Sequence, residues 1–238
     1  MSRIDPPTRE ILHLIAAHVM GRRRFEAVGR FGLRALPGGF GTPAFGEPIE
    51  VVRISGTALV HEVGAEASHV PIEGSTLREL ANRVGTDLGR EFSAGDDTPA
   101  LHSPDAPVTL DPESVESIAR WFDLGWQAMD RLSKEIPDDG DCATIQLWPE
   151  HFDAATNVVL RNGDRMNVGV SPGDSFEAEP YAYVGPWSSE RLGDPEFWNA
   201  PFGAFLRSSE ILGEPDPVSS CTQFFTAGLE NATGGRRR

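Results

Sequence analysis

The sequence predicts an α+β fold, with antiparallel strands in one or more sheets and helices packed against one side of them. Two patterns carry this prediction. Residues 144–171 contain short runs in which apolar and polar residues alternate, which is typical of half-buried strands. Residues 8–25 and 112–135 instead repeat their apolar residues at the spacing of amphipathic helices. A single compact unit, in which strands and helices share one core, accounts for both patterns.

The C-terminal half is predicted to hold an antiparallel meander. Its strands are expected at residues 144–148, 155–160, 165–171 and 181–184. Between the second and third, Asn162-Gly163 predicts a two-residue type I′ hairpin turn, because both residues tolerate the positive φ that this turn requires. In the return strand the apolar residues share one face, and Asn167, Gly169 and Ser171 share the other.

Further elements follow from the same patterns. Helices are predicted at residues 8–25, 75–84, 112–135 and 216–229, and strands at 31–36, 49–54 and 57–63. Ser75 or Thr76 is expected to cap the second helix, and Asp111 the third. The Gly-rich segment 37–45 lacks the Gly-Lys-Ser/Thr ending of a phosphate-binding loop. We therefore expect it to be a structural loop in which backbones pack closely.

The chain length allows one large domain or two small ones. The segment 89–110 is rich in Pro, Gly and Asp, which predicts a long loop or linker. We expect a single domain over residues 1–238, with possible lobes at 1–95 and 108–230. The sequence does not indicate an oligomeric state.

Composition excludes several classes of function. The formal net charge is −15, which disfavours binding to nucleic acid because its phosphates are also negative. No apolar run approaches the roughly 20 residues of a membrane span, and the N-terminus lacks the apolar core of a signal peptide. Cys142 and Cys221 form no Cys-x-x-Cys motif. Together these features predict an acidic cytoplasmic protein with reduced thiols.

Candidate catalytic residues are His151 and Asp153. If this segment is extended, both side chains point to the same face, where they can bind a metal or form an acid–base pair. Glu179 is a further candidate metal ligand. We also expect His151 and Asp153 to line a polar cavity together with Asp174 or Glu179. The structural alternative is that Asp153 hydrogen-bonds the backbone at a strand break and His151 is a satisfied polar group.

A second group of side chains is suited to binding an organic ligand. Its members are aromatic or acidic, namely Trp148, Asp174, Glu179, Tyr181, Tyr183 and Trp198. Aromatic rings, with Trp187 among them, can stack on such a ligand while the carboxylates fix its orientation. Three hypotheses therefore stand side by side: an enzyme using acid–base or metal chemistry, a non-catalytic module that binds a small molecule, and a purely structural motif. The chain contains no His-Glu-x-x-His, so this zinc-binding motif does not decide between them.

Four segments resemble a family of uncharacterised bacterial proteins. They are Trp-Pro-Glu-His-Phe-Asp (148–153), Gly-Val-Ser-Pro-Gly-Asp (169–174), Glu-Pro-Tyr (179–181) and Phe-Trp-Asn-Ala-Pro-Phe (197–202). The resemblance covers roughly residues 144–206, and the Arg-rich composition is similar to that of proteins from actinobacteria. It implies no activity, cofactor or mechanism, so the function hypotheses depend on the residues themselves.

Overall fold

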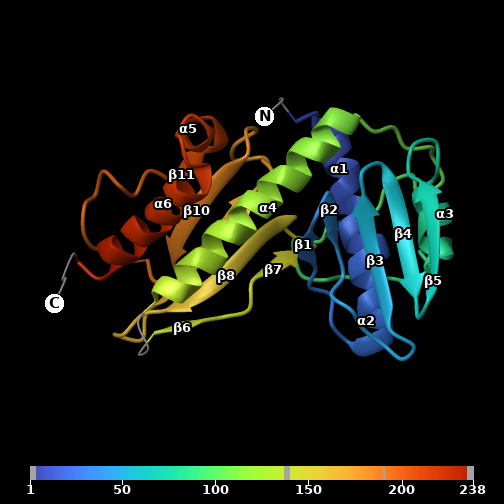
Figure 1. Cartoon of the computed structure of the whole chain (residues 1–238), viewed down its shortest axis with the longest axis horizontal. Helices are drawn as coiled ribbons and strands as arrows, with labels where there is room; N and C mark the ends of the chain where they lie inside the picture. The colour runs from blue at the N-terminus through green and yellow to red at the C-terminus, as the bar shows by residue number, and fades with distance from the viewer. Residues whose placement is uncertain (1–3, 137–139, 190, 235–238) are drawn as a thin grey trace. The chain divides into compact units, whose positions relative to one another are not determined.

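The computed structural model describes residues 4–136, 140–189 and 191–234. It contains two antiparallel sheets and several helices, which confirms the predicted α+β class (Figure 1). Contacts divide the chain into two compact units. Unit 1 holds residues 1–120 and 147–152, and unit 2 holds residues 121–146 and 153–238. The segment 89–110, predicted as a linker, therefore lies within unit 1.

Unit 1 is built around a sheet with the strand order β1-β2-β3-β4-β5. Its strands are β1 (Arg34–Leu36), β2 (Gly39–Gly41), β3 (Glu50–Ser55), β4 (Ala58–Val63) and β5 (Glu66–Pro71). Its helical elements are α1 (Pro6–Ile15), the π-helix η1 (Ala16–Gly21), α2 (Arg22–Val28) and α3 (Leu77–Arg83). The helix predicted at 8–25 is confirmed, but its middle turn is π-helical. Strand β5 was not predicted, because four of its six residues are exposed and it lacks a buried apolar face.

Two features of unit 1 were predicted correctly from short stretches of sequence, namely the cap of α3 and the close packing of the Gly-rich segment. Thr76 caps α3 in a capping box, accepting from the Glu79 backbone N–H while the Glu79 carboxylate accepts from the Thr76 N–H. In the Gly-rich segment, a Cβ added to Gly41 would lie 2.5 Å from the Val52 carbonyl oxygen. The predicted close packing of backbones is therefore confirmed, and part of the segment is strand β2.

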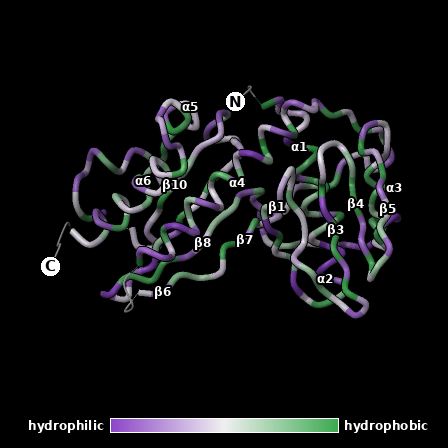
Figure 2. The backbone as a smooth tube through the Cα atoms, viewed as in Figure 1, coloured by the Kyte–Doolittle hydropathy of each residue, from purple (hydrophilic) through white to green (hydrophobic). Residues whose placement is uncertain are grey.

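Unit 2 contains a second sheet with the strand order β11-β10-β9-β8-β6. These strands are β6 (Asp141–Cys142), β8 (Asp153–Val159), β9 (Arg165–Ser171), β10 (Tyr181–Pro186) and β11 (Ala204–Arg207). The helices are α5 (Ser208–Leu212), α6 (Pro217–Ala232) and α4 (Pro112–Glu135), of which residues 121–135 belong to this unit. Figure 2 shows hydrophobic and hydrophilic residues alternating along α4, as expected for an amphipathic helix. Among the described helices, none is long and apolar enough to cross a membrane.

Helices α4 and α6 pack on the same face of this sheet (Figure 1). A Cβ added to Gly125 of α4 would overlap the Val170 side chain, and one added to Gly228 of α6 would lie 2.5 Å from Val184. In the strand register Val184 is opposite Val168, which shares a face with Val170. Two glycines thus let two helices approach the sheet closely, and the prediction that helices pack on one side is confirmed.

The other face of the sheet carries polar and aromatic side chains from four strands. Strand alternation and register place these on it: Asp153, Asn157, Asn167, Gly169, Tyr181, Tyr183 and Phe205. Burial of the apolar face under α4 and α6 therefore fixes which side of the sheet is available for a site.

The hairpin between β8 and β9 differs from the prediction. The Leu160 N–H donates to the Asp164 carbonyl at 2.8 Å, so the loop has three residues, 161–163. Gly163 has a φ of 87°, whereas Asn162 is not among the described non-glycine residues with positive φ. The two-residue type I′ prediction is wrong, because the Asn162 side chain accepts from the Asp164 N–H and stabilises a longer turn that ends on left-handed Gly163.

The left-handed conformation makes Gly163 a testable position. We expect Gly163→Val to lower the free energy of unfolding by about 1–2 kcal/mol, because a β-branched residue is strained at positive φ. An added Cβ would meet no atom within 4 Å, so backbone strain is the main cost. The control is Gly163→Asn, which tolerates this conformation and should cost clearly less. Equal midpoints of urea denaturation for the two variants would contradict the assignment.

Candidate functional site

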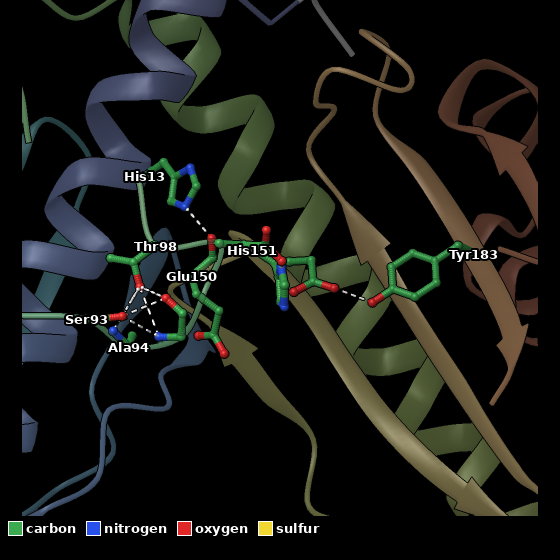
Figure 3. A network of polar contacts seen from close by, with 10 residues as sticks. His13, Ser93, Ala94, Thr98, Glu150, His151 and Tyr183 are labelled. Atoms are coloured by element: carbon green, nitrogen blue, oxygen red, sulfur yellow. Dashed lines mark hydrogen bonds and ion pairs between the residues drawn. The ribbon is translucent and has the colours of Figure 1, made fainter. Parts of the chain in front are cut away.

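The polar face of unit 2 holds a partly buried tyrosine–carboxylate pair. The Tyr183 hydroxyl of β10 donates a hydrogen bond to Asp153 Oδ2 of β8, as Figure 3 shows for the labelled tyrosine. The strand between them, β9, places Gly169 opposite Tyr183. A Cβ at Gly169 would lie only 2.6 Å from the Tyr183 hydroxyl oxygen. The missing side chain at Gly169 therefore allows the tyrosine to extend across one strand and reach the next.

A second pair lies beside the first. Tyr181 donates to Asp174 Oδ2 at 2.7 Å, and the rings of Tyr181 and Tyr183 are 6.2 Å apart. The other oxygen of Asp174 accepts from the backbone N–H groups of Phe176 and Glu177. Asp174 thus holds the loop after β9 as well as the tyrosine.

Burial and these carboxylates determine the protonation of both phenols. Burial raises the pKa of Tyr181 well above its usual range, and the hydrogen bond to Asp174 raises it further. Burial likewise raises the pKa of Tyr183, and the charge on Asp153 adds to the effect. Both phenols are therefore neutral donors at physiological pH, which suits them to positioning and not to accepting a proton from a substrate.

Tyr183 also borders a pocket of about 590 Å³. This volume lies in the range typical of small-molecule sites, about 300–1,000 Å³. Its described lining includes the aromatic rings of Tyr183, Trp187 and Phe202 together with the polar side chains of Asn167, Ser188, Ser189 and Arg191. The pocket therefore combines flat apolar surfaces with hydrogen-bonding groups.

Trp187 is the most exposed of these aromatic residues, at 58% of its surface. Its Nε1–H donates to the side-chain oxygens of Asn167 (2.7 Å) and Asn157 (3.1 Å). The Arg165 guanidinium lies 5.1 Å from the ring centroid, in a cation–π contact. Three side chains from two strands thus hold an exposed indole in a fixed place.

Phe202 is held by aromatic neighbours. Its ring centroid lies 5.0 Å from that of Phe176, 6.2 Å from Tyr183 and 6.5 Å from Tyr181. The first two contacts are edge-on, an arrangement that aromatic pairs favour. The aromatic wall of the pocket is therefore continuous with the tyrosine pairs.

His151 and Asp153, which were predicted to act together, have different partners in the structure. Residues 149–152 form a turn, in which the Phe152 N–H donates to the Trp148 carbonyl and Phe152 has a φ of 55°. The segment is not extended, so the basis for a shared face is wrong. His151 lies in unit 1, half-exposed, with Nδ1 3.6 Å from Asp97 Oδ2. Asp153 lies in unit 2 and engages Tyr183.

The remaining predicted site residues lie in different surroundings. Glu179 accepts from the Ser208 hydroxyl at 3.1 Å and the Ser209 N–H at 2.6 Å, so it fixes the start of α5. Trp148 packs near Phe31 in unit 1. Neither tryptophan of the predicted set, Trp148 or Trp198, is among the pocket's described lining residues.

Metal ligation finds little support in this arrangement. Among the described residues, no three His, Cys, Asp or Glu side chains gather closely enough to hold an ion. Of the predicted metal set, His151 lies in unit 1 while Asp153 and Glu179 lie in unit 2. Within unit 2, Asp153 and Glu179 contact different groups.

Several pocket residues were not predicted as site residues, among them Asn167, Arg191 and Phe202. The alternation in β9 did place Asn167 on the polar face with Gly169. Arg191 and Phe202 lie in the irregular segment between β10 and β11, where no strand or helix periodicity predicts which side chains line a pocket.

Unit 1 contains a separate cluster of polar groups (Figure 3). His13 Nε2 lies 3.1 Å from the Glu150 carbonyl oxygen, and its ring stacks on Phe152 at 5.3 Å. Burial lowers the pKa of His13 to about 4, against the effect of the backbone hydrogen bond. Burial also raises the pKa of the Glu150 carboxyl, whose side chain contacts the loop around Gly95. His13 is therefore uncharged at neutral pH, and its contact with the Glu150 carbonyl is suited to holding the segment around Glu150.

Three comparisons were made, with protein-family models, with curated proteins and with solved structures, and none of them gives a match. The resemblance to a bacterial family stays a prediction.

Proposed function

We propose that this protein binds a planar organic small molecule in the pocket beside Tyr183, Trp187 and Phe202. The observation that carries the proposal is Trp187, a large aromatic side chain that is mostly exposed yet held by two asparagines and an arginine. A fixed, exposed aromatic side chain that lines a pocket is typical of a site that stacks on a ligand.

The carboxylates that contact the two tyrosines favour ligand binding over acid–base catalysis. Asp153 and Asp174 each accept from a tyrosine hydroxyl, and both tyrosines are neutral. These carboxylates therefore act on the ligand indirectly, by orienting the aromatic rings. The alternative of an acid–base enzyme that uses His151 with Asp153 has less support, because His151 lies beside Asp97 and the Asp153 carboxylate accepts from Tyr183.

A cytoplasmic location in a bacterium belongs to the same proposal. Cys142 and Cys221 are both free thiols, and Cys221 is buried. Free thiols agree with a reducing compartment. The net charge of −15 agrees with a small-molecule partner in place of nucleic acid.

The proposal is tested by ligand-observed NMR with a panel of planar compounds built on indole, naphthalene and purine rings. At least one is expected to bind, with a Kd in the micromolar to millimolar range. Trp187→Ala should weaken that binding about tenfold or more, because stacking contributes about 1–3 kcal/mol per ring. The matched control is Phe25→Ala, which removes an exposed aromatic ring of unit 1 and should leave binding unchanged. Equal losses in both variants, or no binding by any compound, would refute the proposal.

A further inference from the structure

We infer that the ligand carries a hydrogen-bond acceptor, a ring nitrogen or a carbonyl oxygen, at the edge of its planar ring, and that the side-chain amide of Asn167 recognises this acceptor. The inference rests on the proposed function, because it takes Trp187 as the surface on which the ring stacks. It adds the chemical class of the ligand and names Asn167 as the residue that determines specificity.

The first support is the orientation of the Asn167 amide. Its Oδ1 accepts from Trp187 Nε1–H at 2.7 Å. An indole nitrogen can only donate, so the amide atom that it meets is the oxygen. The group that Asn167 offers to a ligand is therefore Nδ2, which carries two N–H donors. Asn167 is exposed and lines the pocket, so these donors are accessible from it.

The second support is the place of this amide beside the indole. The Nε1–H bond lies in the plane of the ring, so a well-aligned hydrogen bond puts the Asn167 amide at the ring edge. The Arg165 guanidinium lies over the Trp187 ring, 5.1 Å from its centroid, and is not among the described lining of the pocket. A ligand therefore stacks on the opposite face, at a separation of about 3.5 Å. An acceptor at the edge of that ligand comes within reach of the Asn167 N–H groups.

The third support comes from other polar groups of the pocket, which already hold parts of the chain. Arg191 donates to the backbone carbonyls of Ser188 at 2.6 Å and Pro201 at 3.4 Å. The Tyr183 hydroxyl donates to a carboxylate of β8. These groups maintain the shape of the pocket. At Asn167 a ligand acceptor gains a hydrogen bond, whereas a ligand donor would face another donor, so the amide selects between them.

Asn157 provides a matched control within the same strand pair. It lies opposite Asn167 in the register of β8 and β9, and its Oδ1 accepts from Trp187 Nε1 at 3.1 Å. Asn157 is not among the described lining residues of the pocket. The two asparagines therefore hold the same indole and differ in their place relative to the pocket.

The test compares neutral bicyclic rings on the intact chain, with Kd measured by NMR titration. Quinoline and chromone carry an acceptor and no donor at the ring edge, whereas indole and 3-methylindole carry an N–H donor. The acceptor rings are expected to bind about fivefold tighter than the donor rings, a difference of ~1 kcal/mol. Because all these rings are neutral, the preference should change little as salt is added.

Variants assign the preference to the Asn167 amide. Asn167→Asp replaces the N–H donors by an acceptor oxygen but keeps an oxygen for Trp187 Nε1–H. The preference should therefore reverse, with the acceptor rings losing about fivefold or more in affinity and the donor rings losing none. Asn157→Asp adds the same charge beside the same indole and should retain the preference for acceptor rings. Circular dichroism verifies the fold of each variant.

The outcomes separate this inference from the proposed function. Equal binding of acceptor and donor rings, still lost in Trp187→Ala, would overturn the inference and leave the proposed function standing. Tighter binding of the donor rings by the wild type would overturn it in the same way. An acceptor preference that survives in Asn167→Asp, or that is lost equally in Asn157→Asp, would reject the Asn167 amide as its source. If no ring binds at all, the proposed function fails together with the inference.

Discussion

Replacing Gly169 by alanine is expected to lower the free energy of unfolding by about 3 kcal/mol and to weaken ligand binding in the pocket. The added Cβ would lie 2.6 Å from the Tyr183 hydroxyl oxygen and 2.7 Å from the Ala154 carbonyl oxygen. Overpacking of this kind costs about 1–3 kcal/mol. Displacing Tyr183 also breaks its hydrogen bond to Asp153, and a hydrogen bond to a charged group contributes about 1.5–3 kcal/mol.

Urea denaturation measures the loss of stability, and a double-mutant cycle identifies its cause. If the clash with Tyr183 dominates, Gly169→Ala should cost much less in a Tyr183→Ser background. The control Gly213→Ala lies at an exposed helix end where φ is −72°, so it should change the midpoint little. A Gly169→Ala variant as stable as the wild type would show that Tyr183 does not lie across this glycine.

The second large effect is a loss of stability on acidification that is caused by His13. Burial lowers the pKa of His13 from 6.5 to about 4 in the folded protein. The unfolded chain therefore binds a proton at a higher pH than the folded protein does. The stability that His13 contributes is complete above pH 6.5 and is lost as the pH falls towards 4. The expected loss between pH 7 and pH 4 is about 3 kcal/mol.

His13→Gln removes the titrating ring and should flatten the pH dependence by this amount, although the loss of stacking on Phe152 lowers stability at every pH. Free energies of unfolding are measured in urea from pH 4 to pH 8 for both proteins. The raised pKa of Glu150 acts in the opposite direction, because a buried neutral carboxyl loses stability as the pH rises. Both proteins contain Glu150, so its contribution cancels when the free energies of unfolding of His13→Gln and wild type are subtracted at each pH.

The control His69→Gln replaces an exposed histidine of β5 and should keep the wild-type profile. Parallel profiles for His13→Gln and wild type would refute the prediction.

Much of the secondary structure follows from the sequence itself. The spacing of apolar residues predicted helices close to the observed α3, α4 and α6, and strands close to β3, β4 and β9. Capping of α3 was readable because Thr76 and Glu79 lie within one turn of each other. Such signals act over a few residues, so the local chain contains everything that they require.

The turn between β8 and β9 and the segment 149–152 show where local reading fails. Asn162-Gly163 is compatible with two kinds of hairpin, and the register of the flanking strands selected the three-residue loop. His151 and Asp153 are two residues apart, yet the turn that ends at Phe152 places them in different units. Strand register and turn geometry depend on partners that are distant in sequence.

The sequence by itself determined that aromatic and acidic residues are concentrated between residues 148 and 202, and Tyr183 and Trp187 of that stretch do line the pocket. Only the tertiary structure decided that Asp153 orients Tyr183 across Gly169. It also decided that Arg191 and Phe202 line the same pocket as Tyr183. The physical reason is that residue type sets which chemistry is possible, whereas strand pairing sets which groups meet. A glycine becomes part of a site only when the opposite strand supplies the side chain that occupies its space.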